Sequence, residues 1–500
     1  MAEEIVISVS PHETRVAVVE QGLLQEIFIE RFHTRGTVGN IYKAKVVRVL
    51  PGLQSAFVDI GQSRAAFMHI TDLIDTHESV MRDLGEKTEY PPINKVLYEG
   101  KEFLVQVSKE PISTKGARAT ANISLASRFL VYMPETSHIG ISQRIEDEQE
   151  RERLKVILDK IYDAQLGDGF IVRTASDRAE EAEILNDAEL LRSRWAKVEL
   201  DSLSAKATCL VFEDLPLHLR VMRDIINKDT VRITVDSKSI YSVLENFLLS
   251  FIPEKLDCLS LSTLEEPLFD VHNLEDQIEA ALNQRVQLKS GGYLIIDQTE
   301  AMTTVDINSG AFVGRKDLEE TVYRTNLEAA AAIPRQLRLR NMGGIVIIDF
   351  IDMMDEEHKR QVLRTLEKGQ QTDRVKWNIT EISELGLVEM TRKRTHESLL
   401  KMMCEPCGTC SGKGFIKSAE TICLEIFREI RRRAIFSSDK ACLIMASQSV
   451  IDRLLDEDAT CLSQIAKSLE FEIRLQVESS YTQEQFDVVQ SFQPPAALPV

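Results

Sequence analysis

The alternation of apolar and polar residues is most informative between positions 293 and 353, where two apolar runs flank a long polar segment. Residues 302–308 alternate as a β-strand does, which places Asp306 and Asn308 on one face. Residues 345–350 form a nearly continuous β-branched run that carries Asp349, a pattern typical of a strand covered on both sides. Residues 317–340 are long enough for a helical crossover, so the two strands should be parallel. Pro334 lies inside this helical pattern and should kink or break the helix.

Asp306 and Asp349 should therefore emerge at the carboxyl ends of two parallel strands, the edge at which open α/β sheets bind ligands. If the strands are neighbours, the two carboxylates lie about 5 Å apart and repel each other. A Mg²⁺ ion would relieve the repulsion, and Asn308 could orient the carboxylate of Asp306 beside it. The alternative is that both aspartates cap turns after strands, a common use of this residue. The spacing alone leaves both interpretations open.

Upstream of this region, shorter alternating runs predict two all-β segments. Residues 4–34 contain three such runs and predict an antiparallel meander. Residues 36–120 contain about five strands and several basic residues, which fits a small OB-type barrel. Phe57 and Phe67 flank a tight turn in this segment and could stack on nucleic-acid bases. For an isolated pair of aromatic residues, however, a place in the barrel core is the favoured interpretation.

The segment that follows combines charged helices with a short strand. Helices are predicted over residues 144–163 and 177–199, and a strand between them ends in Arg173 and Thr174. A guanidinium group beside a hydroxyl suits a terminal phosphate. On these residues alone, a surface arginine in a loop is the better interpretation.

The run CEPCGTCSGKG at residues 404–414 places three thiols at three-residue spacing before two glycines. This pattern is typical of half a zinc ribbon or knuckle, although a redox-active pair is the alternative. The absence of a thioredoxin-like context favours metal. Structural zinc takes four ligands, so either His396 or a second chain would complete the site. A second chain would make the zinc a dimer clasp. Residues 416–500 predict a small α/β domain.

Composition limits the class of protein. The 500 residues are 43% hydrophobic and 28% charged, which is typical of a globular protein with several domains. The net charge of −19 argues against general nucleic-acid binding but allows a locally basic groove. The start MAEEIVISVS predicts no signal peptide, and the eight cysteines are expected to be reduced. We therefore expect a cytoplasmic protein without stable membrane association.

Several strings together identify a family. They are GNIYKAKVVRVLPGLQSAFVDIG, FIVRTA, SGGYLIIDQTEAMTTVDINSGAFVG, RQLRLRNMGGIVIIDFIDM, GLVEMTRKR and the cysteine run. In this order they resemble the ribonuclease E/G family across nearly the whole chain, and most of all its short form, which lacks a long disordered tail. The family pattern CPxCxGxG is not matched fully, because Gly408 follows Cys407 and an extra Cys404 precedes it. The glycine register favours Cys407 and Cys410 as the zinc pair. Pro334 has no counterpart in the family pattern.

The resemblance implies a multidomain α/β and α+β fold. Its implied parts are an RNase H-like domain split between residues 1–35 and 218–281, an S1-type OB RNA-binding domain at 36–120, a 5′-monophosphate sensor at 121–217, a DNase-I-like catalytic domain at 282–403, a zinc-link at 404–415 and a small C-terminal α/β domain at 416–500.

The resemblance also implies a role for individual residues. Asp306 and Asp349 would bind the catalytic Mg²⁺, with Asn308 in support. Phe57, Phe67 and Lys115 would contact RNA, and Arg173, Thr174 and Val131 would bind a 5′-phosphate. Cys407 and Cys410 would bind a structural Zn²⁺ that is shared between protomers.

The expected function is that of a Mg²⁺-dependent endoribonuclease that hydrolyses single-stranded A/U-rich RNA and leaves 5′-phosphate ends. A 5′-monophosphate should stimulate it, and rRNA processing and mRNA decay are its expected roles. A homodimer through the zinc-link, or a dimer of dimers, is the expected assembly. Three alternatives remain at this point: a non-catalytic RNA-binding protein, a DNA nuclease or phosphatase, and a zinc-assembled structural dimer.

Overall fold

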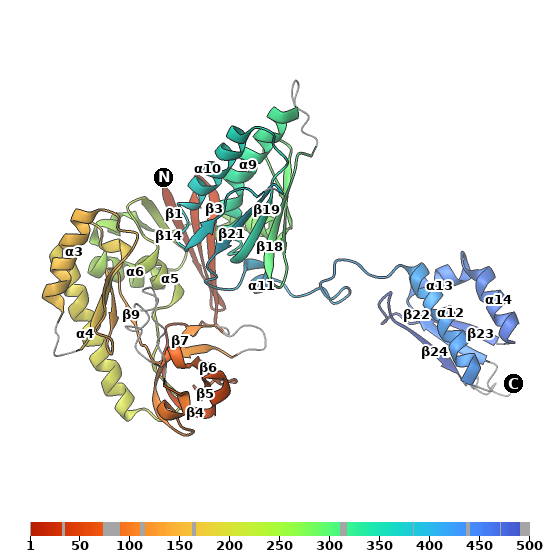
Figure 1. Ribbon diagram of the computed structural model, residues 1–500, viewed down its shortest axis with the longest axis horizontal. Coiled ribbons are helices and arrows are strands. Elements are labelled where there is room, and N and C mark those ends of the chain that lie inside the picture. Colours follow the sequence, from red (N-terminus) through yellow and green to blue (C-terminus); the bar gives the residue numbers. More distant parts are fainter. Residues whose placement is uncertain are drawn as a thin grey trace. The chain divides into compact units, whose positions relative to one another are not determined.

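The computed structural model describes residues 2–32, 36–73, 91–110, 116–162, 167–310, 318–383, 385–436, 441–470 and 472–490. The chain divides into two compact units, Met1–Leu400 and Lys401–Val500. Figure 1 shows the elements of each unit coloured along the chain. Among the described residues, no helix combines the length and apolar character needed to cross a membrane.

The first sheet of the larger unit joins two distant parts of the chain. Its strands, in sheet order, are β15 (Leu259–Leu261), β14 (Thr230–Val235), β1 (Glu3–Val9), β2 (Glu13–Glu20) and β3 (Leu23–Arg31). The antiparallel meander predicted for the amino terminus is confirmed, and β14 adds to it in parallel with β1. One face packs against α5 (Leu217–Asp224) and α6 (Lys238–Phe251), and the other against α7 (Leu268–Val271) and α8 (Leu274–Leu282).

A closed five-stranded barrel follows, as the sequence predicts. Its strands are β4 (Ile41–Leu50), β5 (Ser55–Asp59), β6 (Ala66–His69), β8 (Arg118–Thr120) and β7 (Glu102–Lys109). Pairing of β4 with β7 closes the barrel, which gives it an OB-like form. A later strand, β13 (Cys209–Phe212), pairs antiparallel with the first residues of β4.

The next part is a four-stranded sheet covered by two long helices. Its elements are β9 (Leu125–Ala126), β10 (Leu130–Met133), β11 (Ile139–Ile141), β12 (Gly169–Val172), α3 (Glu148–Ile161) and α4 (Glu181–Ser204). Both helices begin later than predicted, because capping interactions decide where they start. The Asp147 carboxylate accepts hydrogen bonds from the first turn of α3, and Glu180 and Glu183 form a capping box at α4.

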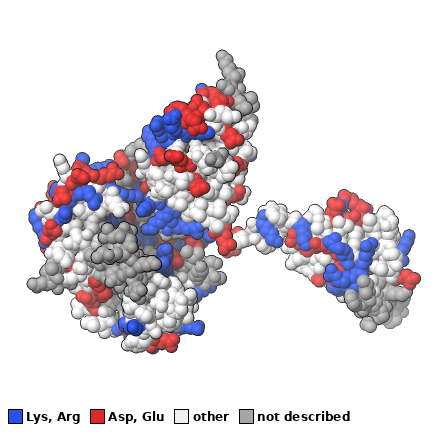
Figure 2. Space-filling view, viewed as in Figure 1, with Lys and Arg blue, Asp and Glu red and all other residues white. Residues whose placement is uncertain are grey.

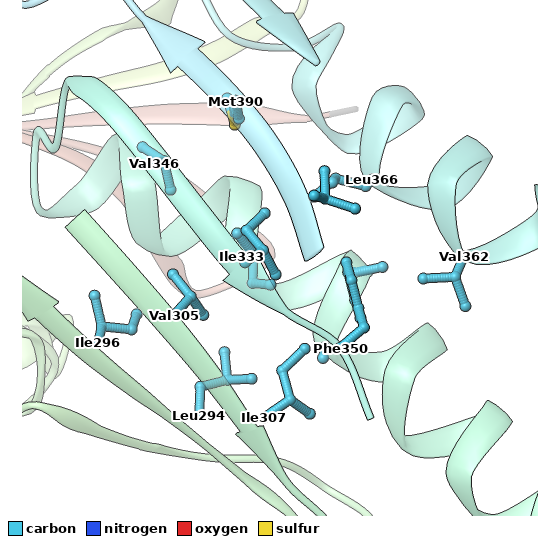
Figure 3. Close-up of a cluster of buried hydrophobic side chains, with 14 of the residues drawn as sticks. Leu294, Ile296, Val305, Ile307, Ile333, Val346, Phe350, Val362, Leu366 and Met390 are labelled. Carbon is cyan, nitrogen blue, oxygen red and sulfur yellow. The ribbon is translucent and has the colours of Figure 1, made fainter. Parts of the chain in front are cut away.

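The central stretch of the sequence folds into a six-stranded sheet. In sheet order its strands are β16 (Arg285–Gln287), β17 (Tyr293–Gln298), β18 (Met302–Asn308), β19 (Gly344–Asp349), β21 (Leu387–Arg392) and β20 (Trp377–Ile379). Strands β18 and β19 are parallel, as the crossover predicts, and the crossover contains α9 (Leu318–Leu339). Figure 3 shows the core between this sheet and the helices, with Ile333 of α9 toward Val305 and Val346, and Val362 of α10 (Glu356–Gln370) on the side of Phe350.

One expectation for this sheet is wrong. Strand β19 is not covered on both sides, because Val346 and Ile348 are fully buried whereas Ile345 is 47% exposed. The β-branched run hides an alternation in which isoleucine occupies both faces. Of the two outcomes expected at Pro334, a kink or a break, the break does not occur, because α9 continues through this residue. Pro334 is buried, and the glycine at position 369 of α10 leaves room for its ring, since a Cβ there would lie 2.7 Å from Pro334 Cγ.

The second unit is a three-stranded sheet with helices packed on it. Its elements are β23 (Glu472–Val477), β22 (Ala441–Ala446), β24 (Phe486–Gln490), α12 (Ala419–Phe436), α13 (Gln448–Leu455) and α14 (Ala459–Leu469). The small α/β domain predicted from the sequence is therefore present, with one helix and one strand more than the pattern indicated.

The contact of Pro334 with Gly369 generates a stability prediction. The Gly369→Ala substitution should destabilise the protein by roughly 1–3 kcal/mol, because a rigid proline ring occupies the space of the new methyl group. In a Pro334→Ala background the same change should be neutral or stabilising, since alanine favours a helix over glycine. Melting temperatures of the four proteins form the double-mutant cycle. An equal effect of Gly369→Ala in both backgrounds would contradict this account.

Candidate active site

Asp306 and Asp349 are directly opposite each other. They are Cα partners in the register of the parallel strands β18 and β19, so the expected neighbourhood of the two strands is confirmed. Neighbouring strands lie roughly 5 Å apart. Both side chains are exposed, on the face of the sheet opposite to the apolar core formed by Val305 and Ile348. The site and the core therefore use the two faces of the same strands.

Negative charges gather around this pair of aspartates. Partial burial and the negative charges of Asp306 and Asp352 raise the pKa of Asp349. The Asn308 amide donates a hydrogen bond of 2.8 Å to Oδ2 of Asp306, which agrees with the orienting contact expected from the sequence. Asp352 was not among the predicted site residues, although the repeated acid in IDFID was a visible signal for it.

The backbone that follows Asp349 is held by a buried side chain of the crossover helix. Asn326 of α9 is completely buried. Its Oδ1 accepts a hydrogen bond of 3.1 Å from the amide of Ile351, and its Nδ2 donates one of 2.7 Å to the carbonyl of the same residue. An asparagine in an alanine-rich helix was the only sequence signal for this clamp, and the sequence analysis missed it.

The donor set fits one class of metal ion. In the part of the chain that the structure describes, no three or more His, Cys, Asp or Glu residues come together as metal ligands. Two carboxylates with an open side suit Mg²⁺, which keeps several waters and takes one or two carboxylates together with phosphate oxygens. A site of this kind cannot be a closed structural zinc site.

The residues predicted to bind a 5′-phosphate come together on the four-stranded sheet. Val131 of β10 is paired with Ile171 of β12, and Arg173 follows two residues later on the same face. Arg173 is not a free surface residue, because its Nη1 donates to the carbonyl of Ser127 and its Nη2 donates to Asp224. The hydroxyl of Thr174 is hydrogen-bonded to that of Ser142 at 3.1 Å.

The two aromatic residues of the barrel face outward. Phe57 and Phe67 are opposite each other on β5 and β6, with their ring centroids 5.9 Å apart in an edge-to-face arrangement. Their strand neighbours Ala56, Val58, Ala66 and Met68 fill the core, whereas both phenylalanines are only half-buried. The favoured core interpretation is therefore wrong. Lys115, the third residue expected to contact RNA, lies outside the described residues.

The cysteine run forms a tight turn in the second unit. The backbone amides of Cys410 and Thr409 donate hydrogen bonds to the sulfur of Cys407 and lower the pKa of its thiol. This polarity stabilises a thiolate, the form that binds metal. Cys404 and Cys407 are exposed and Cys410 is half-buried. The alternative ligand, His396, belongs to the first unit, where its ring lies edge-on against Phe28.

On the face shown in Figure 2, basic and acidic side chains of the first unit are interspersed and do not form one continuous basic surface. The fold and the site together define a class of protein: a mixed α/β chain that has an OB-like barrel and two acidic residues near the ends of neighbouring strands. The family model for the "Ribonuclease E/G family" matches residues 124–395. This protein belongs to that family.

Individual relatives of this chain belong to the same family. Ribonuclease G of Escherichia coli strain K12 is 48% identical over 490 residues, which are 98% of this chain and 100% of the relative. Ribonuclease G of Haemophilus influenzae is 47% identical over 489 residues, 98% of this chain and 99% of the relative. Ribonuclease E of Haemophilus influenzae is 36% identical over 468 residues, 93% of this chain and 50% of the relative.

A second family model, described as "RNase E/G, Thioredoxin-like domain", matches residues 406–491. This match weakens the prediction of a metal site at the cysteines, because that prediction rested partly on the absence of a thioredoxin-like context. One observation still favours metal. The cysteine pair lies in a turn well before α12 begins at Ala419, whereas a redox-active pair typically lies at a helix N-terminus. The lowered pKa of Cys407 suits either role.

The Asn326 clamp generates a prediction. The Asn326→Ala substitution should lower stability by roughly 1–3 kcal/mol, because it leaves the amide and carbonyl of Ile351 without their buried partners. Asn246→Ala is the matched control, since Asn246 is an exposed helical asparagine that should tolerate alanine. Melting temperatures measure both effects, and equal values for the two variants would exclude the clamp.

Proposed function

We propose that this protein is a Mg²⁺-dependent endoribonuclease that hydrolyses single-stranded RNA. The observation that carries the proposal is the register of Asp306 against Asp349 on the open face of the sheet, in a chain with full-length relatives named ribonuclease G. The resemblance further implies A/U-rich cleavage sites, 5′-phosphate products, and roles in rRNA processing and mRNA decay.

Asp306 and Asp349 would hold the Mg²⁺. Partial burial and the negative charges of Asp306 and Asp352 raise the pKa of Asp349, and a divalent cation bound beside it would offset both effects. When bound between these carboxylates, the ion would supply Lewis-acid chemistry for phosphodiester hydrolysis. Asn308, through its hydrogen bond to Asp306, keeps that carboxylate in one orientation.

The barrel supports a preference for single-stranded substrate. Outward-facing Phe57 and Phe67 offer ring surfaces on which bases can stack, and bases are free to stack on protein only outside a duplex. Lys115 would contribute a cation to the phosphate backbone. Arg173, Thr174 and Val131 would bind a 5′-monophosphate, since an oriented guanidinium, a hydroxyl and a small apolar contact suit a terminal phosphate.

We infer a homodimer, or a dimer of dimers, joined by zinc. Cys407 and Cys410 supply half of the four ligands that a structural zinc takes, and a second copy would supply the rest. We also infer the domain assignment implied by the resemblance. The sheet shared by β1–β3 and β14–β15 supports a split RNase H-like domain at residues 1–35 and 218–281.

A non-catalytic RNA-binding protein is the alternative. It would use the barrel and the cysteine turn and would give no reason for two carboxylates in register. The following experiment separates the two functions.

The Asp349→Asn variant should cleave a 5′-monophosphorylated single-stranded RNA at least 100-fold more slowly than wild type, because it removes one of two metal ligands. Cleavage by wild type should require Mg²⁺ and stop in EDTA. Glu389→Gln is the matched control, an exposed carboxylate on the same face opposite Ile347. Binding without Mg²⁺-dependent cleavage would favour the alternative, and faster cleavage of the all-deoxy strand would indicate a DNA nuclease.

A separate prediction concerns the 5′ end. Wild type should cleave a 5′-monophosphorylated oligonucleotide faster than its 5′-hydroxyl form, and Arg173→Gln should abolish the difference because it removes the cation that binds the phosphate. Lys155→Gln, an exposed change on α3 of the same domain, should preserve it. Initial rates on both substrates give the ratio. A wild-type ratio of one would eliminate the 5′-phosphate site.

A further inference from the structure

Arg173 is paired with a carboxylate from another part of the first unit. Its Nη2 lies 2.7 Å from Oδ1 of Asp224, the last residue of α5, which packs on the first sheet. The two side chains are 26% and 34% exposed, so the pair lies at the surface and a ligand can reach it. A phosphate that binds Arg173 must therefore share its guanidinium with Asp224.

Asp224 is itself held by a second arginine. Nε of Arg223 lies 3.0 Å from Oδ1 of Asp224, and Nη2 of Arg223 lies 2.9 Å from Oδ2. The remaining Nη1 of Arg223 donates to Asp214 at 3.3 Å and to the carbonyl of Ala126 at 3.2 Å. The four side chains alternate in sign, in the order Arg173, Asp224, Arg223 and Asp214. Arg223 is only 9% exposed, so its guanidinium group interacts with Asp224 and Asp214 and is not accessible to a ligand.

The carboxylate remains ionised. Burial opposes the charge, but the guanidinium groups of Arg223 and Arg173 outweigh burial and lower the pKa of Asp224. A fixed negative charge thus lies beside the arginine that would receive the 5′ end.

The resemblance already implies that a triphosphate end reacts more slowly at this site than a monophosphate end. We propose that Asp224 is the specificity-determining residue behind this preference, because its fixed negative charge disfavours a more highly charged terminus beside Arg173. The inference rests on the 5′-phosphate site proposed above. Its physical basis is Coulombic. Any phosphate bound to Arg173 lies within several ångströms of the Asp224 carboxylate, and the repulsion grows in proportion to the charge of the ligand.

The competing explanation is that Asp224 only tethers α5 to the sheet that carries Arg173. The chain offers a matched comparison for it. Arg128, which precedes β10, pairs at 3.2 Å with Glu254 of the short helix η5 (Pro253–Cys258), beside the same first sheet. Loss of the Arg128–Glu254 pair would remove a similar bridge between the four-stranded sheet and the first sheet, whereas the partners of Arg173 would stay in place.

The experiment uses the full chain and three oligonucleotides of one sequence with 5′-hydroxyl, 5′-monophosphate and 5′-triphosphate ends. The specificity constant kcat/KM is measured for wild type, Asp224→Asn, Asp224→Glu and Glu254→Gln. In Asp224→Asn the triphosphate-to-monophosphate ratio should rise about tenfold, because one negative charge is lost beside the ligand. Asp224→Glu keeps the charge and should keep the wild-type ratio, as should Glu254→Gln. The effect of Asp224→Asn should shrink at high salt.

Three results would overturn the inference. If Asp224→Asn slows all three substrates equally, the residue is only a tether. If Glu254→Gln changes the ratio as much as Asp224→Asn, the effect belongs to the boundary between the two parts and not to the charge beside Arg173. If wild type cleaves the hydroxyl and monophosphate substrates equally, the 5′-end site itself is absent. That last result leaves the Mg²⁺-dependent cleavage at Asp306 and Asp349 untouched.

Discussion

Two like charges held side by side are the constraint on which this molecule's candidate chemistry depends. Asp306 and Asp349 face each other across β18 and β19, and neither can withdraw without breaking the parallel ladder between them. The ladder is held by the opposite face of the same strands, where Val305 and Val346 are buried against α9 and α10. A slip of one residue would expose the core and bury the acids. Hydrophobic burial therefore specifies the register, and the spacing of the carboxylates follows from it.

Arginine side chains connect the parts of the first unit to one another. The loop between α10 and β20 is the clearest case. Asp373 forms an almost fully buried pair with Arg392 of β21, and Arg374 pairs with Glu3 of β1. The carbonyls of Asp373 and Arg374 also accept hydrogen bonds from Arg144, which precedes α3. A guanidinium has five donors and can satisfy partners in two parts at once. The contact of Arg173 with Asp224 is of the same kind, so a ligand at Arg173 would share its guanidinium with a contact between two parts of the first unit.

Local patterns predicted the elements of the central sheet well and their surroundings less well. The crossover between residues 317 and 340 is helical, and Asn308 contacts Asp306 as expected. Pro334 was judged from its own helix alone, and the space left by Gly369 on another helix was not visible in that pattern. Phe57 and Phe67 were placed in the core because aromatic residues are usually buried. Their outward direction follows from the strand alternation around Ala56 and Met68, which the usual burial of aromatic residues does not take into account.

The sequence by itself determined the family, the strand and helix types of the central stretch, and the acids at its strand ends, because these depend on periodicity and on motifs that are local in the chain. Only the tertiary structure decided what lies against them. It paired β1 with β14 more than 200 residues away, left one face of β19 open, brought Asn326 to Ile351, and set Asp224 against Arg173. Contacts between residues far apart in the chain leave no periodic trace in either partner. They arise when apolar faces pack and carry their polar neighbours into reach.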